Sequence, residues 1–343
     1  MRHIAALLAT LLLVACDALS PGNQSLRLPI PITNNAVALV GDTAYSFAGL
    51  GAGKTWKDVT SRAFACDLPV ASCREIPGLP DGVGRLASAA VVVHGKIFLF
   101  GGYTVAMDAT EVSTPDVWAF DPATETYALM TEMPVPVDDA VAVTYQDRYV
   151  YLISGWHDGD DNNVDLVQVL DTQQNRWFTA TRFPGAPVFG HAGGIIGNII
   201  LICDGVKVVP PVTIAKRRTF APSPACWRGE IALDDPAKIS WSLAGVMPPA
   251  HYRMAATGFA GGIWFAGGSD NPYNYNGIGY DGNASTASKR LWRYDIKTNK
   301  FSNQPDKPLA SMDHRAMLVW QDKFVIVGGM GTQQEVLDVV QIF

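Results

Sequence analysis

Basic side chains recur at one position of this 343-residue sequence, at the start of six segments that are rich in small residues. Five of the twelve residues there are Arg or His, where the overall share of basic residues predicts about one. The six pairs are Asn34-Asn35, Gly84-Arg85, Asp138-Asp139, Gly190-His191, Tyr252-Arg253 and His314-Arg315. Histidine takes and gives a proton near neutral pH, and arginine binds a carboxylate through two parallel hydrogen bonds. The pattern indicates a basic mouth that could transfer protons and hold an anionic group. The alternative is that these side chains only satisfy carbonyl groups around a channel.

A second set of polar and aromatic side chains follows a glycine at the end of each segment. These side chains are Tyr103, Trp156, His157 and Lys207, then the loop residues Asp270, Asn271, Tyr273, Asn274, Tyr275 and Tyr280. Aromatic faces pack on the C–H surfaces of sugars, while carboxylates and amides bind sugar hydroxyls. The loop after Gly268 is therefore expected to cover a carbohydrate site. A surface loop packed only on itself is the alternative.

Both sets belong to a unit that occurs six times, in the period range of propeller repeats. Each unit has a proline, a small-residue strand, a polar turn, an apolar strand and one or two glycines. The closing glycines are Gly49, Gly102, Gly155, Gly205, Gly268 and Gly329. Antiparallel strands return to the face they left, so the strand openings and the loops after the glycines should meet at one mouth.

The second half of each unit also recurs, as a hairpin with an Asp six residues before an aromatic residue. The pairs are Asp121 and Tyr127, Asp171 and Trp177, and Asp295 and Phe301. Here the sequence resembles kelch-repeat β-propellers, whose marks are the glycine pair and the spaced aromatic residues. We expect an all-β fold, a six-bladed kelch-type β-propeller. Residues around Ser25 to Ile30 should add the strand that the last unit lacks, which closes the ring and removes sheet edges.

The N-terminal segment has the pattern of an export signal. Arg2 and His3 precede an apolar run that ends at Val14 and is too short to span a bilayer. The run ends in Leu-Val-Ala-Cys, which resembles the lipobox of bacterial lipoproteins, where the cysteine (here Cys16) is lipidated. We expect a signal peptide over 1–15, a tether over 16–24 and the propeller over 25–343. An ordinary signal peptide is the alternative.

The expected location is the periplasmic side of a bacterial cell envelope, where a lipid anchor would hold the chain to a membrane. Four further cysteines could form disulfides there. We favour Cys66 with Cys73 and Cys203 with Cys226, because both pairs would close hairpins; two other connectivities remain open.

Composition excludes some functions. With 48% hydrophobic and 17% charged residues the chain is not disordered, and its net charge of −6 argues against nucleic-acid binding. The segment His157 to Asp165 has alternating oxygen ligands but lacks the glycine and glutamate of a calcium loop, so an acidic surface loop is favoured. We expect no metal and no cofactor.

Two stretches resemble the bacterial periplasmic kelch mutarotases, or epimerases, that act on N-acetylneuraminate. These are Gly49 to Trp56, and the loop with Asn274, Tyr275 and Tyr280. The resemblance implies ring opening of a sugar acid by acid/base catalysis. It places Lys207 with the family's fourth-blade lysine. The proposed proton acceptor of that family, a glutamate, has no match in Asp204-Gly205-Val206-Lys207, so Asp204 or another carboxylate would have to take its role.

The predicted roles follow from that chemistry. His191, His314 and Asp204 are the proton-transfer candidates, and Arg253 or Arg315 would bind the carboxylate. Arg85, Lys207, Trp156, His157 and the loop residues from Asp270 to Tyr275 complete the substrate-binding set.

Two other functions remain open. A non-catalytic lipoprotein that binds a glycan or an envelope protein would use the same mouth without proton-transfer groups. A copper-radical oxidase is the weaker alternative, since it needs a Cys–Tyr cross-link and two histidine ligands.

Overall fold

The structure of the chain is a computed structural model that describes residues 26–158, 163–209, 219–247, 249 and 251–343. Cys16, the domain boundaries at residues 15 and 24, and the basic run from Lys216 to Arg218 lie outside these residues. Over the described ranges, no helix combines the length and the apolar character that crossing a membrane would require.

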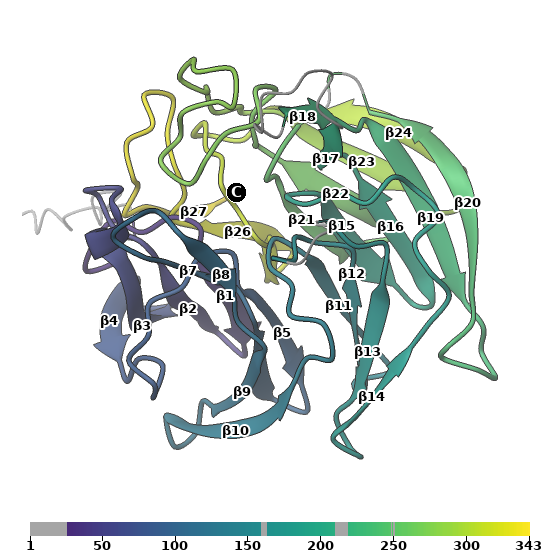
Figure 1. Cartoon of the computed structure of the whole chain (residues 1–343), viewed down its shortest axis with the longest axis horizontal. Helices are drawn as coiled ribbons and strands as arrows, with labels where there is room; N and C mark the ends of the chain where they lie inside the picture. The colour runs from purple at the N-terminus through teal and green to yellow at the C-terminus, as the bar shows by residue number, and fades with distance from the viewer. Residues whose placement is uncertain (1–25, 159–162, 210–218, 248, 250) are drawn as a thin grey trace, which may run out of the picture.

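Six antiparallel sheets follow one another around the molecule, in chain order (Figure 1). Blade 1 holds β1 (Ala36–Val40), β2 (Thr43–Leu50), β3 (Val59–Asp67) and β4 (Ser72–Ile76). Blade 2 holds β5 (Ala89–Val93), β6 (Lys96–Phe100), β9 (Asp116–Asp121) and β10 (Thr126–Glu132). Blade 3 holds β11 (Val141–Tyr145), β12 (Tyr149–Ile153), β13 (Val167–Asp171) and β14 (Arg176–Thr179).

The other three blades complete the circle. Blade 4 holds β15 (Ala192–Ile196), β16 (Ile199–Cys203), β19 (Ala225–Ile231) and β20 (Ile239–Val246). Blade 5 holds β21 (Ala255–Phe259), β22 (Gly262–Ala266), β23 (Leu291–Asp295) and β24 (Lys300–Gln304). Blade 6 holds β25 (Leu318–Trp320), β26 (Lys323–Val327) and β27 (Val340–Ile342). The predicted all-β propeller with six blades is confirmed.

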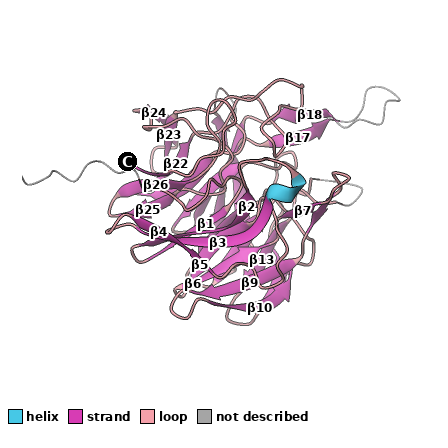
Figure 2. Ribbon diagram, turned by 90° about the vertical axis from the view of Figure 1, so that its left-hand side faces the viewer, coloured by secondary structure: helices cyan, strands magenta, loops and turns pink. Residues whose placement is uncertain are grey.

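Short elements are added outside the blades. The hairpin β7 (Tyr103–Val105) and β8 (Glu111–Ser113) is inserted into blade 2, and β17 (Val206–Val209) and β18 (Thr219–Pro222) into blade 4. Both hairpins lie on the same side of the molecule (Figure 2), and the 3₁₀ turn η1 (Trp56–Asp58) follows β2.

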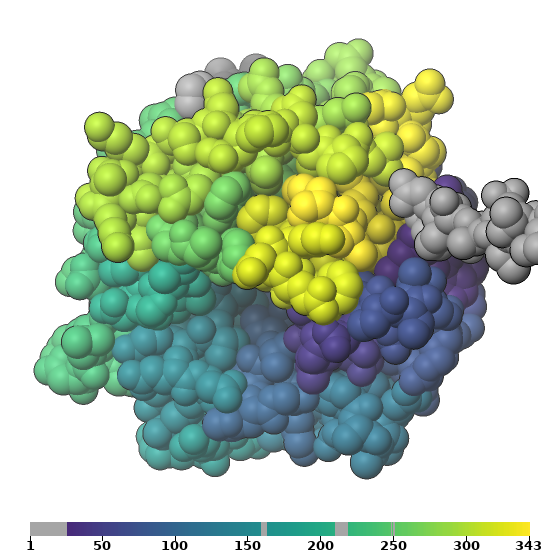
Figure 3. Space-filling view, turned by 180° about the vertical axis from the view of Figure 1, so that it is seen from behind, coloured from purple at the N-terminus to yellow at the C-terminus, as the bar shows by residue number. Residues whose placement is uncertain are grey.

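The innermost strand of each blade packs against that of the next, and β25 contacts β1. The yellow C-terminal segment accordingly lies beside the purple N-terminal one (Figure 3). Together these strands line a central channel of about 390 Å³. Small residues are needed there: a Cβ on Gly194 would lie 2.9 Å from the backbone nitrogen of Gly258.

Residues 26–28 run antiparallel to β27. The backbone nitrogen of Leu28 donates to Asp338 at 2.7 Å, and that of Val340 donates to Leu26 at 2.8 Å. Leu26 and Leu28 are buried in the core between blades 6 and 1. That this segment closes the circle of blades stays a prediction.

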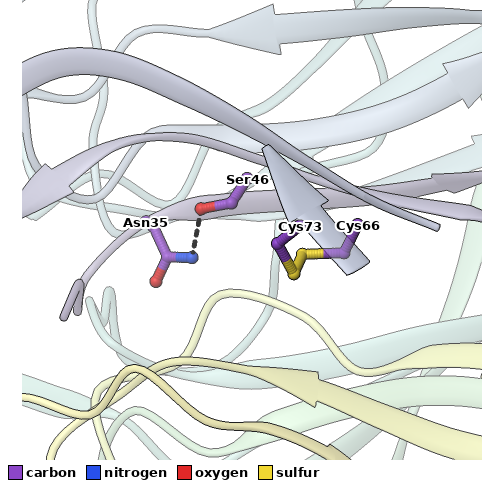
Figure 4. The surroundings of a disulfide bond; sticks show 4 residues. All are labelled: Asn35, Ser46, Cys66 and Cys73. Atoms are coloured by element: carbon purple, nitrogen blue, oxygen red, sulfur yellow. Dashed lines mark hydrogen bonds between the residues drawn. A yellow bond between two sulfur atoms is a disulfide. The ribbon is translucent and has the colours of Figure 1, made fainter. Parts of the chain in front are cut away.

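Both predicted disulfides are present. Cys66 pairs with Cys73 across β3 and β4 (Figure 4), and Cys203 pairs with Cys226 across β16 and β19. The second bond joins the two ends of the segment that carries β17 and β18. Near the first bond, Asn35 Nδ2 donates to Ser46 Oγ at 2.8 Å.

A ring of backbone hydrogen bonds ties the six blades together at one end of the channel. Each blade contributes one residue with a positive φ, just before its inner strand: Asn34, Ala87, Asp139, Gly190, Arg253 and Asp313. The bonds, of 2.8 to 3.2 Å, run from Ala87 N to Asn34 O, Asp139 N to Ala87 O, Gly190 N to Asp139 O, Arg253 N to Gly190 O, His314 N to Arg253 O and Asn34 N to Asp313 O. Below, "the ring" means these six residues and their bonds.

The six closing glycines are required by the same arrangement. All have a positive φ, and each would place a Cβ within 2.5 to 3.0 Å of the carbonyl oxygen just before a ring residue. That preceding residue pairs with the residue after the glycine in every blade. The expected meeting of strand openings and post-glycine loops at one mouth is therefore confirmed.

Alanine in place of a closing glycine should destabilise the fold for two reasons: the positive φ strains the alanine backbone, and the added Cβ contacts neighbouring atoms. Gly268 has a φ of +76°, and its Cβ would lie 2.9 Å from Tyr252 O and 2.7 Å from Met254 Cγ. Gly95 has a φ of +73° with nothing within 4 Å. We expect Gly95→Ala to lower the free energy of unfolding by about 1 kcal/mol and Gly268→Ala by about 2–4 kcal/mol, measured in urea. Equal decreases in the free energy of unfolding would show that the Cβ contact at Gly268 is unimportant.

Candidate functional site

Two aspartates and two arginines form a buried ion network at the ring. Arg253 donates to Asp139 through Nε at 3.2 Å and Nη2 at 2.5 Å, and through Nη1 to Asp313 at 3.0 Å. Arg315 also contacts both carboxylates, and Thr33 Oγ1 donates to Asp313 at 2.8 Å. All four charged side chains are at most 5% exposed. The network joins blades 3, 5 and 6, and its opposite charges compensate one another.

A cavity of about 140 Å³ opens beside this network. Its lining joins carboxyl groups, one guanidinium and aromatic rings from the two inserted hairpins and the loop after Gly268. The lining residues are Tyr103, Glu111, Asp138, Asp139, Trp156, Phe189, Phe220, Arg253, Asn274, Tyr275 and Tyr280. We call this the inner cavity.

A larger groove continues from the inner cavity, with which it shares Phe220, Asn274 and Tyr280. This outer groove has a volume of about 1090 Å³ and lies between β18 and the loop after Gly268, with Asp270, Asn271 and Asp281 in its lining. Ligand pockets generally measure about 300–1,000 Å³. The two spaces together are therefore large enough for a small carbohydrate.

Two carboxyl groups of the inner cavity have perturbed acidity. Burial raises the pKa of Asp138 to about 8; a hydrogen bond from Ser113 Oγ at 2.7 Å opposes this rise, and the charges of Asp158 and Glu111 add to it. Desolvation also raises the pKa of Glu111, although the residue is exposed to solvent, and the charge of Arg253 opposes this rise. At neutral pH Asp138 therefore carries a proton and can donate it.

The two predicted catalytic histidines are buried against the closing glycines, and His191 lies at the interface between blades 3 and 4. A Cβ on Gly205 would meet His191 at 2.8 Å, and one on Gly329 would meet the ring of His314. Burial lowers the pKa of His191 to about 4 and, together with the charge of Lys307, that of His314 to about 3. His191 Nε2 lies 2.8 Å from Ile153 O, and His314 Nε2 lies 2.8 Å from Ser311 Oγ. Both imidazoles are neutral, and neither lines the inner cavity.

Asp204 and Arg85 are likewise placed in interfaces between blades. Asp204 is 2% exposed, it accepts the backbone N–H of His251 at 3.1 Å, and burial raises its pKa. Arg85 is paired with Asp81 and Asp116. Neither residue lines the inner cavity.

Most of the predicted substrate-binding residues lie near the mouth. Trp156, Arg253, Asn274 and Tyr275 line the inner cavity, and Asp270 and Asn271 line the outer groove.

The remaining predicted residues are placed elsewhere. Tyr273 is fully buried, 5.5 Å from the guanidinium of Arg253, so its ring faces protein and not a ligand. Arg315 is held in the ion network, Lys207 is exposed on β17, and His157 Nδ1 bonds to Pro136 O at 2.8 Å.

The ring also shows which residues open the inner strands. In blade 2 the ring position is Ala87, three residues after Gly84, and in blade 6 it is Asp313, one residue before His314. The sequence-based pairs in these blades were out of register. Counting fifteen or sixteen residues back from each closing glycine gives the ring residue in all six blades.

No group of three metal-ligating side chains occurs within the described ranges, and part of the segment His157 to Asp165 lies outside them. The four cysteines after Cys16 are engaged in disulfides. None of the four can supply the Cys–Tyr cross-link of a copper-radical oxidase.

Comparison with known proteins shows similarity to kelch-repeat proteins. The Kelch motif family matches residues 84–134. Kelch-like protein terF of Aspergillus terreus is 26% identical over 250 residues, which are 71% of this chain and 51% of terF. The N-acetylneuraminate epimerase of Haemophilus influenzae is 23% identical over 343 residues, covering 88% of this chain and 86% of the epimerase.

A solved structure described as "Structure of YjhT" superposes with a TM-score of 0.72 at 15% identity, over 92% of this chain and 95% of YjhT. For terF and for two further kelch proteins, from chicken and Arabidopsis, the matched part is about half of the relative's length or less. The chain is a kelch-type β-propeller. Over most of its length it resembles the N-acetylneuraminate epimerases.

The sequence analysis did not predict three residues that line the inner cavity: Glu111, Phe189 and Phe220. Glu111 and Phe220 lie on the inserted hairpins, and Phe189 directly precedes a ring residue. For Glu111 and Phe220, the length of the segments after Gly102 and Gly205 could have indicated this, because both segments are long enough to fold back over the mouth.

Asp139 should be important for stability, because it accepts hydrogen bonds from two buried arginines. We expect Asp139→Asn to lower the free energy of unfolding by about 3–5 kcal/mol, since it leaves buried charge uncompensated. Glu75→Gln is the matched control, because it removes an exposed partner of Arg62. The control should unfold as the wild type does. A comparable, small effect of both changes would contradict a structural role for the network.

Proposed function

We propose that this protein is a sugar mutarotase. The single observation that carries the proposal is that Glu111 and Asp138, both with raised pKa values, line one aromatic cavity at the mouth of the propeller. Pairs of carboxyl groups in different environments commonly divide the roles of acid and base. The similarity to N-acetylneuraminate epimerase supports a reducing sugar or sugar acid as the substrate.

The reaction needs one base and one acid. Glu111, as carboxylate, accepts the proton of the anomeric hydroxyl while the bond from the anomeric carbon to the ring oxygen breaks. Asp138, as carboxylic acid, gives its proton to that ring oxygen. The open-chain carbonyl compound rotates about its carbon–carbon bond and closes on the other face, and both protons return to their donors. Such proton transfers accelerate reactions by roughly 10²–10⁴.

The surrounding residues fit these roles. Ser113 holds the Asp138 carboxyl by its hydrogen bond at 2.7 Å. Trp156, Phe189 and Phe220 pack edge-to-face or tilted at 5.3 to 6.1 Å between ring centroids, which gives the cavity a rigid apolar wall. An aromatic wall of this kind binds the C–H face of a pyranose.

Variants of the two carboxyl residues test the proposal. Glu111→Gln and Asp138→Asn should each reduce the enzymatic rate of anomer equilibration at least 100-fold, followed by proton NMR on freshly dissolved sugar. Glu75→Gln, remote on β4, should keep the wild-type rate. In the wild type the rate should fall as pH rises above about 8, because Asp138 loses its proton, and fall in acid as Glu111 gains one.

The controls separate this function from the alternative. A wild-type rate equal to the buffer blank, with sugar signals shifted or broadened by binding, would contradict catalysis and favour a non-catalytic glycan-binding protein. Full activity in both carboxyl variants would contradict the assigned roles.

We also propose that the chain is exported and anchored through a lipid on Cys16. The apolar run before Cys16 and the two disulfides support this, since disulfides are characteristic of oxidising compartments. In bacteria that express the full chain and are grown with labelled palmitate, the wild type should incorporate label into the membrane fraction. Cys16→Ser should not. Equal labelling of both, or of neither, would contradict the anchor.

A further inference from the structure

The charge around the proposed sugar site is predominantly negative. Among the described residues that line the inner cavity and the outer groove, five carry carboxyl groups and one carries a guanidinium. The carboxyl residues are Glu111, Asp138, Asp139, Asp270 and Asp281, and the guanidinium is that of Arg253. Asp138 is protonated at neutral pH, and Asp139 is paired with Arg253 and Arg315. Glu111, Asp270 and Asp281 are therefore the carboxyl groups that set the charge met by a ligand.

That guanidinium is already engaged. Arg253 makes three hydrogen bonds to Asp139 and Asp313, and it is 2% exposed. The rings of Tyr252 and Tyr273 lie 4.8 and 5.5 Å from it. A ligand carboxylate could pair with Arg253 only by displacing a buried aspartate, which would then be left with an uncompensated charge.

Other described basic residues do not replace it. Arg315 contacts the same two aspartates, Arg85 is paired with Asp81 and Asp116, and Lys207 is exposed on β17 outside both linings. The arginines that the sequence predicted to bind a ligand anion are thus paired with aspartates of the protein itself.

The carboxyl groups that remain would repel an anion. Glu111 lines the inner cavity, and among the described residues no ion pair engages its carboxyl group; Arg253 acts on it only through its charge. In the outer groove, hydrogen bonds from Asn283 and Asn271 hold the pKa of Asp281 below its usual range, so this group stays ionised. Like charges a few ångströms apart in a partly desolvated site disfavour binding.

We propose that this site selects an uncharged reducing sugar and discriminates against sugar acids. The inference rests on the proposed function only in taking the inner cavity as a sugar site. Aromatic rings supply stacking, and the carboxyl and amide groups accept and donate hydrogen bonds to hydroxyls. The selectivity would differ from what the name of the Haemophilus epimerase states for its own substrate.

Two matched pairs of sugars test this selectivity. They are D-glucose with D-glucuronate, and N-acetylneuraminate methyl ester with N-acetylneuraminate; each pair differs in one negative charge. Proton NMR gives the anomerisation rate above the buffer blank, and saturation-transfer difference spectra report binding. We expect the uncharged member of at least one pair to bind and react at least tenfold better than its charged partner.

A variant tests whether the carboxylate of Glu111 causes the preference for uncharged sugars. Glu111→Gln should bind the charged members more tightly and so narrow the binding preference, whereas Glu75→Gln should leave it unchanged. Binding rather than rate is the measure here, because Glu111 is also the proposed base.

The outcomes separate the two proposals. Preference for the charged member in both pairs would overturn the selectivity and leave the mutarotase standing. Preferential binding of an uncharged sugar without any acceleration would uphold the selectivity and overturn the mutarotase. Absence of binding and of acceleration for all four sugars would overturn both.

Discussion

The ring of six backbone hydrogen bonds is the constraint on which the rest of the structure depends. It requires one residue of positive φ from each blade, and a Cβ on each closing glycine would then lie within 3.0 Å of the carbonyl oxygen just before that residue. Asn, Asp and Gly tolerate this conformation best, and they fill four of the six positions. The ring fixes which side chains meet at the mouth of the channel.

Because Asp139, Arg253 and Asp313 occupy ring positions, their charges are brought together and buried. The mouth is consequently held by an ion network, in which Arg253 and Arg315 are structural and Arg253 also forms part of the cavity wall. Proton transfer is then assigned to Asp138 and Glu111, which border the cavity next to the network. In the proposed mechanism these two carboxyl groups would take the role of the family glutamate that this sequence lacks.

The sequence predicts the fold well because its glycines, prolines and spaced aromatics recur with the blade. The meeting of loops at one mouth follows from that periodicity, whereas the disulfides were favoured only because both pairs would close hairpins. The site is less predictable, because one residue of register decides whether a side chain faces the channel or the closing glycine. His191 and His314 follow ring positions and pack against the closing glycines, where burial keeps them neutral. Glu111 lies on an inserted hairpin outside the repeat, so no periodicity marks it.

The most direct test of the account is a crystal structure with a reducing sugar, N-acetylglucosamine, soaked at high concentration. The account predicts the pyranose ring against Trp156 and Phe220, with its anomeric hydroxyl and ring oxygen within hydrogen-bond distance of Glu111 and Asp138. A sugar bound away from both carboxyl groups, in crystals where the cavity is open to solvent, would contradict it.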